Sequence, residues 1–147
     1  MKVYIAADHN GFSLKEILKV HLMQKGIETV DMGAEEKIPT DDYPEYAKRV
    51  SEKVAKEEDS KGIVLCGSGV GICIASDKIK GIRCALGFDP RQVKDARNDD
   101  DVNVLALASE YLSEEKAKEL VDVFLSSPFE PEERFKRRIE QIHQLEV

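Results

Sequence analysis

The segment Gly62-Ile63-Val64-Leu65-Cys66-Gly67-Ser68-Gly69-Val70-Gly71 joins an almost continuous apolar run to three glycines at alternating positions. An apolar run of this kind is typical of a parallel strand that is buried on both faces of a sheet. The glycines allow the backbone to turn sharply and to come close to a ligand. The segment therefore predicts a buried strand over 62–66, followed by a tight loop that leads into a helix.

The same apolar pattern recurs along the chain in both directions from this segment. Strands are expected at residues 2–7, 28–32, 62–66, 83–87 and 104–108, with amphipathic helices between and after them. Strand–helix alternation indicates βαβ units, which predict an α/β fold with a parallel sheet covered on both faces. The 147 residues contain no internal repeat and suit a single domain over 1–147.

The expected helices carry signals at their ends. The first opens with a capping box, Ser13-Leu14-Lys15-Glu16, in which the serine and the glutamate satisfy free backbone N–H groups, and Gly26 ends it. The others begin near residues 43, 71, 90 and 113, and the last runs over about 131–146.

The composition argues against several classes of protein. The net charge is −7 with acids and bases interspersed, which argues against a nucleic-acid binder with a basic face. No apolar run approaches the roughly 20 residues of a membrane span, and the N-terminus reads as a strand rather than as a signal peptide. We therefore expect a cytoplasmic protein. Three cysteines without C-x-x-C spacing argue against a disulfide framework and a zinc site.

Residues that follow the strands are the candidates for function, because ligands bind beyond the carboxyl ends of the strands in such sheets. After 62–66, the loop from Gly67 to Gly71 presents backbone N–H groups and a helix dipole to a phosphate or a developing oxyanion. Cys66 at the mouth of this loop can be stabilised as a thiolate. The alternative is a small buried hydrophobic residue, and Cys73 and Cys84 are expected in the core for that reason.

Asp8 and His9 follow the first strand and offer an acid and an imidazole side by side. Such a pair can orient a sugar hydroxyl and hold a phosphate, although a turn in which Asp8 caps the next helix is an equal alternative. The other histidines carry less weight. His21 lies on an apolar helix face and is expected in the core, and His143 is expected on the surface.

The last helix carries Arg134 and Arg138, which are four residues apart and share one face. Two guanidinium groups in this arrangement can clamp a phosphate. The alternative is a solvated face paired with Glu132, Glu133 and Glu140, and the pattern alone slightly favours this alternative.

Together these residues resemble the type B ribose-5-phosphate isomerases, whose close relatives are the galactose-6-phosphate and allose-6-phosphate isomerases. The matching motifs, in one register from residue 2 to about residue 142, are Asp8-His9-x-Gly11-Phe12, Asp42-Tyr43-Pro44, Cys66-Gly67-Ser68-Gly69-x-Gly71, Gly81-Ile82-Arg83 and Asn103-Val104-Leu105. The resemblance implies a Rossmann-like αβα sandwich around a five-stranded parallel sheet. It also implies a homodimer with active sites shared between subunits, and neither a metal nor an organic cofactor.

The resemblance further implies a role for each candidate residue. In the family, a proton moves between C2 and C1 of an opened sugar phosphate through a cis-enediolate, and a cysteine matching Cys66 is the base. Backbone N–H groups from Gly67 through Gly69 to Gly71 hold the enediolate oxygen, with the hydroxyl of Ser68 nearby. The residue matching Asp8 handles sugar hydroxyls, and the residues that bind phosphate match His9, Arg134 and Arg138.

The chain departs from the family near the expected phosphate. The family usually has His-Asn-Asp before its fifth strand, where the histidine assists ring opening and the asparagine helps hold the enediolate oxygen. Here the same register reads Asp99-Asp100-Asp101. Asp99 can pass protons to a ring oxygen, but a carboxylate at Asp100 repels an oxyanion unless it is protonated. Glu110 replaces an arginine that meets the phosphate in many members, and Glu132-Glu133-Arg134-Phe135 replaces the usual Gly-Gly-Arg-His.

Three functions remain open at this point. The first is an active isomerase with ribose 5-phosphate as its substrate, and the second is an isomerase for another sugar or sugar phosphate. The third is a weakly active relative that binds sugar phosphate as a partner subunit. A flavodoxin-like or nucleotide-binding module is disfavoured, because Asp8-His9-Asn10-Gly11 is a poor phosphate loop after the first strand.

Overall fold

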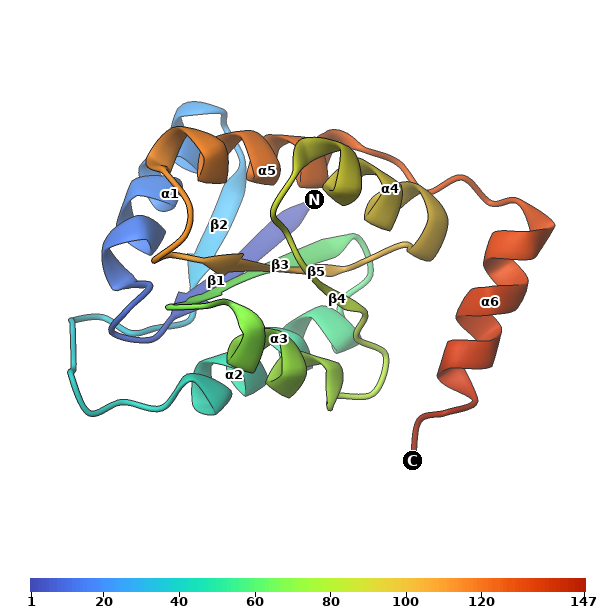
Figure 1. Ribbon diagram of the computed structural model, residues 1–147, viewed down its shortest axis with the longest axis horizontal. Coiled ribbons are helices and arrows are strands. Elements are labelled where there is room, and N and C mark those ends of the chain that lie inside the picture. The colour runs from blue at the N-terminus through green and yellow to red at the C-terminus, as the bar shows by residue number, and fades with distance from the viewer.

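The computed structural model describes residues 1–147 and contains one five-stranded sheet. The strand order is β2-β1-β3-β5-β4, which places β3 at the centre between β1 and β5 (Figure 1). All neighbouring strands pair in parallel, which confirms the predicted α/β class. The strands are β1 (Lys2–Ala7), β2 (Glu28–Asp31), β3 (Ser60–Cys66), β4 (Cys84–Leu86) and β5 (Val104–Ala108).

Helices cover both faces of the sheet, as expected for βαβ units. Figure 1 shows α1, α4 and α5 over one face, α2 and α3 over the other, and α6 standing at one side of the body. The helices are α1 (Phe12–Gln24), α2 (Tyr43–Lys56), α3 (Val70–Asp77), α4 (Pro90–Asp100), α5 (Glu114–Ser126) and α6 (Glu133–His143).

Alternate side chains of each strand pack into two separate hydrophobic cores, one on each face of the sheet. In β1, Val3 and Ile5 pack toward α1, α4 and α5, whereas Tyr4 and Ala6 pack toward α2 and α3. Helix α1 contributes Leu18, which is fully buried. Burying a side chain of this size contributes about 1.5–3 kcal/mol, so the sheet is held from both faces. Cys66 belongs to the core on the α2 and α3 side.

The predicted capping box at the start of α1 is wrong. The helix begins at Phe12 with Gly11 as its N-cap and no side-chain cap, so Ser13 lies one residue inside the helix. Asp8 instead accepts hydrogen bonds from the N–H groups of Asn10 and Gly11 and starts the turn earlier. Gly11 must come close to β3, because a Cβ atom there would lie 2.8 Å from the carbonyl oxygen of Leu65.

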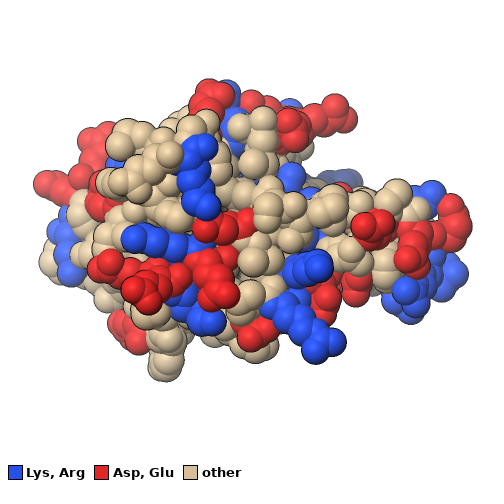
Figure 2. Space-filling model, turned by 90° about the horizontal axis from the view of Figure 1, so that it is seen from above, with Lys and Arg blue, Asp and Glu red and all other residues tan.

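Charged side chains of both signs are mixed over the face that carries α1, α4 and α5 and over the projecting α6 (Figure 2). This agrees with the argument from composition against a basic nucleic-acid-binding face. No helix of the protein combines the length and the apolar composition that crossing a membrane requires.

Candidate active site

Side chains that follow three neighbouring strands meet at the carboxyl edge of the sheet. Cys66 ends β3, Asp8 and His9 follow β1, and Glu110 lies two residues after β5. The register pairs Cys66 with Ala108, so the ends of these strands lie at one level. The structure therefore brings together the candidates that the sequence placed after the first and third strands.

Cys66 is buried beneath the glycine-rich loop, with 4% of its surface exposed. Burial raises the pKa of its thiol, the backbone N–H groups of Ile72, Gly69 and Ser68 lower it, and the Asp8 carboxylate raises it further. The net shift is upward because desolvation outweighs the loop donors, so stabilisation of a thiolate by the loop stays a prediction. The donors are nevertheless in place to stabilise a negative charge at this position.

The shape of the loop depends on Gly69. Its φ is +73°, and a Cβ atom there would lie 2.5 Å from the side chain of Leu86 and 3.0 Å from the backbone nitrogen of Ala108. Residues with a side chain rarely adopt this backbone conformation. Ser68 is exposed at the tip of the loop, where its Oγ accepts a hydrogen bond from the N–H of Val70 at 3.3 Å. The Ser68 hydroxyl proton therefore remains able to donate to a ligand.

Two side chains crowd the loop from outside. The ring of Tyr43 lies over the start of α3, where a Cβ atom on Gly71 would come within 2.5 Å of it. The carboxylate of Glu110 lies beside Gly67, where a Cβ atom would come within 2.9 Å of Oε1, and the Glu110 N–H donates to the Gly67 carbonyl at 3.0 Å. A carboxylate at the rim of this loop opposes the binding of an anion.

Asp8 takes the turn-capping role that the sequence left open, and its role toward a sugar hydroxyl stays a prediction. Its side chain accepts hydrogen bonds from the N–H groups of Asn10 and Gly11 at 3.0 and 3.1 Å, which is the turn-capping role. Burial raises the pKa of its carboxyl, against the hydrogen bond from Gly11 and the attraction of His9. Because the same carboxyl also acts on the pKa of Cys66, it lies within electrostatic reach of the sulfur.

His9 is held by Asp41, a residue that the sequence argument did not select. Asp41 Oδ1 lies 2.7 Å from His9 Nδ1 and accepts the His9 backbone N–H at 3.0 Å. Asp41 Oδ2 accepts a hydrogen bond from the hydroxyl of Tyr46 at 3.0 Å. Asp8, His9 and Asp41 each place one possible ligand atom within 4.8 Å of the others. Because Asp41 and His9 are already bonded to each other, the cluster is organised as a hydrogen-bond network.

The segment that carries Asp41 is anchored by a buried lysine. Lys15 is fully buried, and its Nζ lies 2.9 and 2.8 Å from the two carboxylate oxygens of Asp31 and also donates to the carbonyl of Ala34. The backbone of Ala34 donates to the carbonyl of Ala7 at 3.1 Å. The apolar pattern of α1 gave no sign of this lysine, because an ion pair inside a core depends on a partner distant in the sequence.

Four other candidates do not reach Cys66 within one chain. Asp99 and Asp100 end α4, before β5 begins, whereas Cys66 lies level with the end of β5. The five residues of β5 separate the two levels by roughly 15 Å at the usual rise per residue. Arg134 and Arg138 lie on α6, which packs against α4. The candidates therefore form two groups at opposite edges of the sheet.

A groove of about 780 Å³ lies beside this second group. Asp99 and Asp100 line it together with Ile142, Leu145 and Val147 from the end of the chain. Burial raises the pKa of the Asp100 carboxyl, as does the neighbouring Asp99, while Arg138 and Arg83 lower it. Arg138 thus lies within electrostatic reach of Asp100, which makes the end of α4 and the face of α6 parts of one surface.

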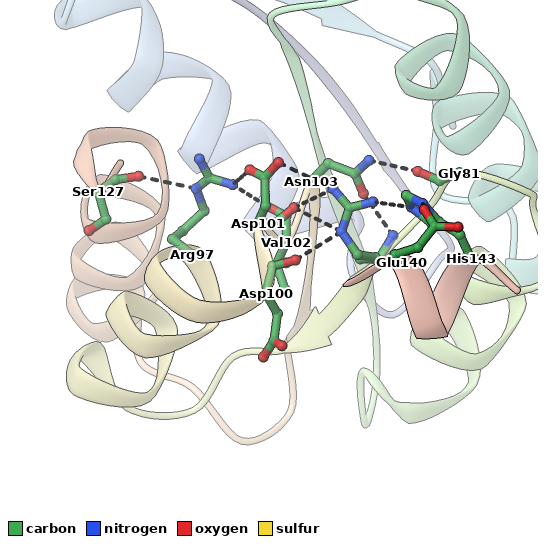
Figure 3. A network of polar contacts seen from close by, with 10 residues as sticks. Gly81, Arg97, Asp100, Asp101, Val102, Asn103, Ser127, Glu140 and His143 are labelled. Atoms are coloured by element: carbon green, nitrogen blue, oxygen red, sulfur yellow. Dashed lines mark hydrogen bonds and ion pairs between the residues drawn. The ribbon is translucent and has the colours of Figure 1, made fainter. Parts of the chain in front are cut away.

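Figure 3 shows Asp100, Asp101 and His143 close together, and hydrogen bonds from Arg83 join them. Its Nε donates to the carbonyl of Asp100 at 2.8 Å, and its Nη2 donates to the carbonyl of Asp101 at 2.8 Å. Its Nη1 lies 3.1 Å from Nε2 of His143 on α6. From the other side, Nη1 of Arg97 donates to the Asp101 carboxylate at 2.8 Å. The ends of α4 and α6 are therefore fixed relative to β4.

In this structure the basic residues of α6 lie on a solvent-exposed face, where Arg134 and Lys136 pair with nearby glutamates. Nε of Arg134 lies 3.0 Å from the Glu132 carboxylate, and its guanidinium lies 4.6 Å from the centre of the Phe135 ring. Lys136 pairs with Glu133 at 2.7 Å. Exposed pairs of this kind contribute little and exchange readily for a ligand.

Of the remaining histidines, His21 differs from expectation, because it is partly exposed rather than in the core and pairs with Asp122 at 2.7 Å. His143 lies on the surface as expected and contacts Arg83. Cys73 and Cys84 are partly buried and pack against the core on the α2 and α3 side, with the Cys73 thiol facing the carbonyl of Cys84 at 3.6 Å. Helix periodicity cannot predict these contacts, because each joins two different elements.

A parallel α/β sheet with a cysteine–glycine loop at its carboxyl edge is the architecture of one class of sugar isomerase, and a sequence profile identifies which one. The Ribose/Galactose Isomerase profile matches residues 3–142. The chain therefore belongs to the ribose/galactose isomerase family, which confirms the resemblance carried by the motifs.

Curated relatives and solved structures agree with this assignment. The chain is 42% identical to a probable ribose-5-phosphate isomerase B of Mycoplasma pneumoniae over 92% of its length and 89% of the relative. It is 39% identical to ribose-5-phosphate isomerase B of Escherichia coli K12, covering 99% and 96% of the two chains. The crystal structure of ribose-5-phosphate isomerase B from Mycoplasma genitalium with bound ribulose-5-phosphate superimposes with a TM-score of 0.93 at 40% identity, covering 97% and 94%. A ribose 5-phosphate isomerase structure from Thermotoga maritima gives a TM-score of 0.94 at 41% identity, covering 98% of each chain.

Proposed function

We propose that the chain is an aldose–ketose isomerase that interconverts ribose 5-phosphate and ribulose 5-phosphate. The observation that carries the proposal is the buried Cys66 thiol, which lies beside Asp8 within a loop whose N–H groups point at the sulfur. The relatives named above are ribose-5-phosphate isomerases, and one of them holds ribulose-5-phosphate, which supports the same pair of substrates.

Cys66 is the base in this mechanism. As a thiolate it takes the C2 proton of the opened aldose, and the C1 carbonyl oxygen becomes the enediolate oxygen. Return of that proton to C1, with transfer of the proton on O2 to O1, gives the ketose and restores the thiolate. A proton next to a carbonyl is weakly acidic, so the forming oxyanion needs donors. The loop from Gly67 to Gly71 supplies N–H groups, Ser68 supplies a hydroxyl, and Asp8 orients the sugar hydroxyls. The scheme uses no metal ion and no organic cofactor.

The phosphate is bound by residues of two subunits in a homodimer. His9 comes from the chain that supplies Cys66, while Arg134 and Arg138 come from α6 of a second copy. Asp99 of that copy passes protons during ring opening, and Asp100 lies beside the sugar, where burial raises the pKa of its carboxyl. The position of these residues at the opposite edge of the sheet from Cys66 supports a shared site.

Exposed apolar side chains near both groups support pairing of two copies. Val70, Ile74 and Phe88 are exposed to 47%, 56% and 66%. Val70 and Ile74 lie on α3, directly after the loop, while Leu145 and Val147 line the groove beside Asp99. Burying such residues between copies is favourable at about 25 cal/mol per Å².

A different sugar is the second candidate, and the acidic replacements favour it. Glu110 stands beside the loop at Gly67, and Asp99 and Asp100 line the groove. Carboxylates at these places weaken the binding of a phosphate and favour contacts with sugar hydroxyls. Allose 6-phosphate and galactose 6-phosphate are the substrates to compare with ribose 5-phosphate.

We place the enzyme in the cytoplasm. All three cysteines are free thiols, which agrees with a reducing compartment.

A coupled assay on the three sugar phosphates tests the proposal, with Cys66→Ala as the variant. We expect turnover of ribose 5-phosphate by the wild type and a fall of roughly 100-fold or more in kcat on loss of the base. Circular dichroism and melting of Cys66→Ala control for folding. Turnover of allose 6-phosphate or galactose 6-phosphate alone would establish the second candidate, and turnover of none would contradict both.

A further inference from the structure

We propose that Asp41 is a positioning residue that acts through His9 and holds the imidazole so that its Nε2 donates to the phosphate of the substrate. The inference rests on the proposed function, because it assumes that His9 meets the phosphate. It goes beyond that function in assigning a role to a residue on the segment between β2 and α2, outside the strand-end candidates.

The geometry fixes both the ring and the backbone of His9. A single oxygen, Asp41 Oδ1, lies 2.7 Å from His9 Nδ1 and 3.0 Å from the His9 backbone nitrogen. The second oxygen is held by the hydroxyl of Tyr46 at 3.0 Å. The Asp41 side chain is 7% exposed, while that of His9 is 27% exposed. The carboxylate is therefore buried behind an imidazole that faces the solvent side of the site.

The carboxylate also decides where the imidazole carries its proton. Because an ionised carboxylate only accepts hydrogen bonds, the proton on Nδ1 is the one that faces Asp41. Burial raises the pKa of Asp41, but the hydrogen bonds from His9 and Tyr46 outweigh it and hold that pKa below its usual range. Asp41 therefore stays ionised at neutral pH and keeps the Nδ1 proton facing it, which turns Nε2 toward the site as the atom that meets a phosphate oxygen.

The segment that carries Asp41 is rigidly mounted on the sheet. The Asp41 N–H donates to the carbonyl of Ile38 at 3.1 Å, and the backbone of Ala34 donates to Ala7 at the end of β1. Lys15 holds the carbonyl of Ala34 from inside the core. The Asp41 carboxylate is thus supported from both ends, and small displacements of a bound group are costly for catalysis.

Asp8 is the other charged group that faces His9, and its attraction to His9 lowers the pKa of the Asp8 carboxyl. Asp41→Asn removes the charged acceptor of the Nδ1 proton, so the ring of His9 is held less firmly while Asp8 remains. The KM for a phosphorylated substrate should therefore be higher in Asp41→Asn than in the wild type. The kcat at saturating substrate should change much less, because Cys66 and the loop are untouched.

The test compares pH profiles of KM and kcat for the wild type and Asp41→Asn in the full-length protein. We expect KM for the sugar phosphate to increase roughly tenfold near pH 7, as for one lost charge-assisted hydrogen bond. Tyr46→Phe, which removes the partner of the other oxygen, should give a smaller shift in the same direction. Asp122→Asn is the matched control, because Asp122 also lies 2.7 Å from an imidazole, that of His21 between α1 and α5. This control should leave the KM profile unchanged.

A double-mutant cycle separates positioning from a general structural effect. In a His9→Gln background, Asp41→Asn should add no further increase in KM, because Asp41 has nothing left to act through. An additive increase, or an unchanged KM profile in Asp41→Asn alone, would overturn the inference.

Nitrogen NMR of the His9 ring in the free protein supplies a readout independent of activity. We expect a proton on Nδ1 in the wild type, and we expect the distribution of the proton between Nδ1 and Nε2 to change in Asp41→Asn. If the wild type turns over no sugar phosphate, the proposed function fails, while an unchanged ring spectrum in Asp41→Asn overturns this inference separately.

Discussion

Cys66 shows how one position can favour opposite charge states of a thiol. The loop directs N–H groups at the sulfur, while burial and the Asp8 carboxylate oppose the thiolate. The raised pKa keeps the resting sulfur neutral, which protects it from oxidants and alkylating agents. In the proposed reaction, a substrate oxyanion and the Cys66 thiolate accept hydrogen bonds from the same N–H groups of the loop. These donors can therefore stabilise the negative charge on either of the two.

The ionisation of Cys66 gives a prediction for its reactivity. Since burial raises the pKa of Cys66 above its ordinary 9.0, its thiolate appears at higher pH than that of a free thiol. Cys73 is the internal comparison, because a hydrogen bond from the Cys84 thiol lowers its pKa. Alkylation by iodoacetamide, resolved by mass spectrometry, should modify Cys73 at lower pH than Cys66. Faster modification of Cys66 at neutral pH would contradict the assignment of a neutral resting thiol.

For single residues, the sequence predicts membership of the site only where the residue's position follows from the end of a strand. Asp8, His9 and Cys66 were accessible because each follows or ends an apolar run, and parallel strands end at one edge. Asp41 was not accessible, because its contact with His9 depends on how the segment after β2 folds back. The two consecutive acids before α2, Asp41 and Asp42, were a possible signal of a functional residue. A solvent-exposed turn has the same composition, so the sequence could not distinguish the two.

At the scale of elements, α1 is fixed by charge as well as by apolar packing. Lys15 and Asp31 form a buried pair, and Lys19 meets the same carboxylate from a more exposed position. Burial raises the pKa of Asp31, but the lysines and the N–H of Gly33 outweigh it and hold that pKa below its usual range. The pair therefore joins α1 to the end of β2 and to the segment that carries Asp41.

Lys15→Met should destabilise the protein by about 3 kcal/mol, because it leaves a partly buried carboxylate short of its main partner. Lys19→Met is the matched control and should cost about 1 kcal/mol or less. The lowered pKa of Asp31 means that its contribution is present above its ordinary pKa of 3.8 and is lost as the pH falls through its folded value. Urea unfolding of both variants should thus show a difference from wild type that shrinks below pH 4. Equal losses for the two lysines would contradict the buried role of Lys15.

The element boundaries that failed share one cause. The start of α1 was expected at a capping box, but a short connection from β1 and the hydrogen bonds from Asp8 begin the helix earlier. Strand β4 was expected over 83–87 and is limited to Cys84–Leu86, since the N–H of Arg83 bonds the side chain of Asn103. In each case a side chain that lies outside the element, Asp8 for α1 and Asn103 for β4, accepts a backbone N–H and changes the boundary. The positions of all five strands were predictable because apolar runs are local features.

At the scale of the whole molecule, a shared site predicts complementation between inactive variants. Cys66→Ala damages the group at the carboxyl edge, and Arg138→Ala damages the group on α6. When the two homodimers exchange subunits at random, half of the dimers are mixed and each mixed dimer has one intact site. Activity should then recover to about a quarter of the wild-type value. Native mass spectrometry of the mixture detects the mixed dimers by mass, and exchange without recovered activity would contradict a site shared between subunits.

The sequence could predict the layers of the molecule but not the arrangement of its two groups of functional residues. Alternation of strands and helices leads to the sandwich, because right-handed crossovers leave few topologies. Whether Arg138 faces Cys66 depends instead on where α6 goes after α5, and α6 packs against α4. Leu145 and Val147, the exposed apolar residues that follow α6, do not indicate by sequence alone which surface they pack against.

The separation of the two groups across β5 also bears on how the protein behaves at different abundances. In the proposed site, a chain that holds Cys66 and His9 at one edge and Arg134 and Arg138 at the other cannot complete a catalytic centre alone. Specific activity should therefore follow mass action, falling on dilution and recovering when substrate, by bridging two copies, draws them together. In a cell, the amount of active enzyme would then respond more steeply than linearly to the rate of its synthesis.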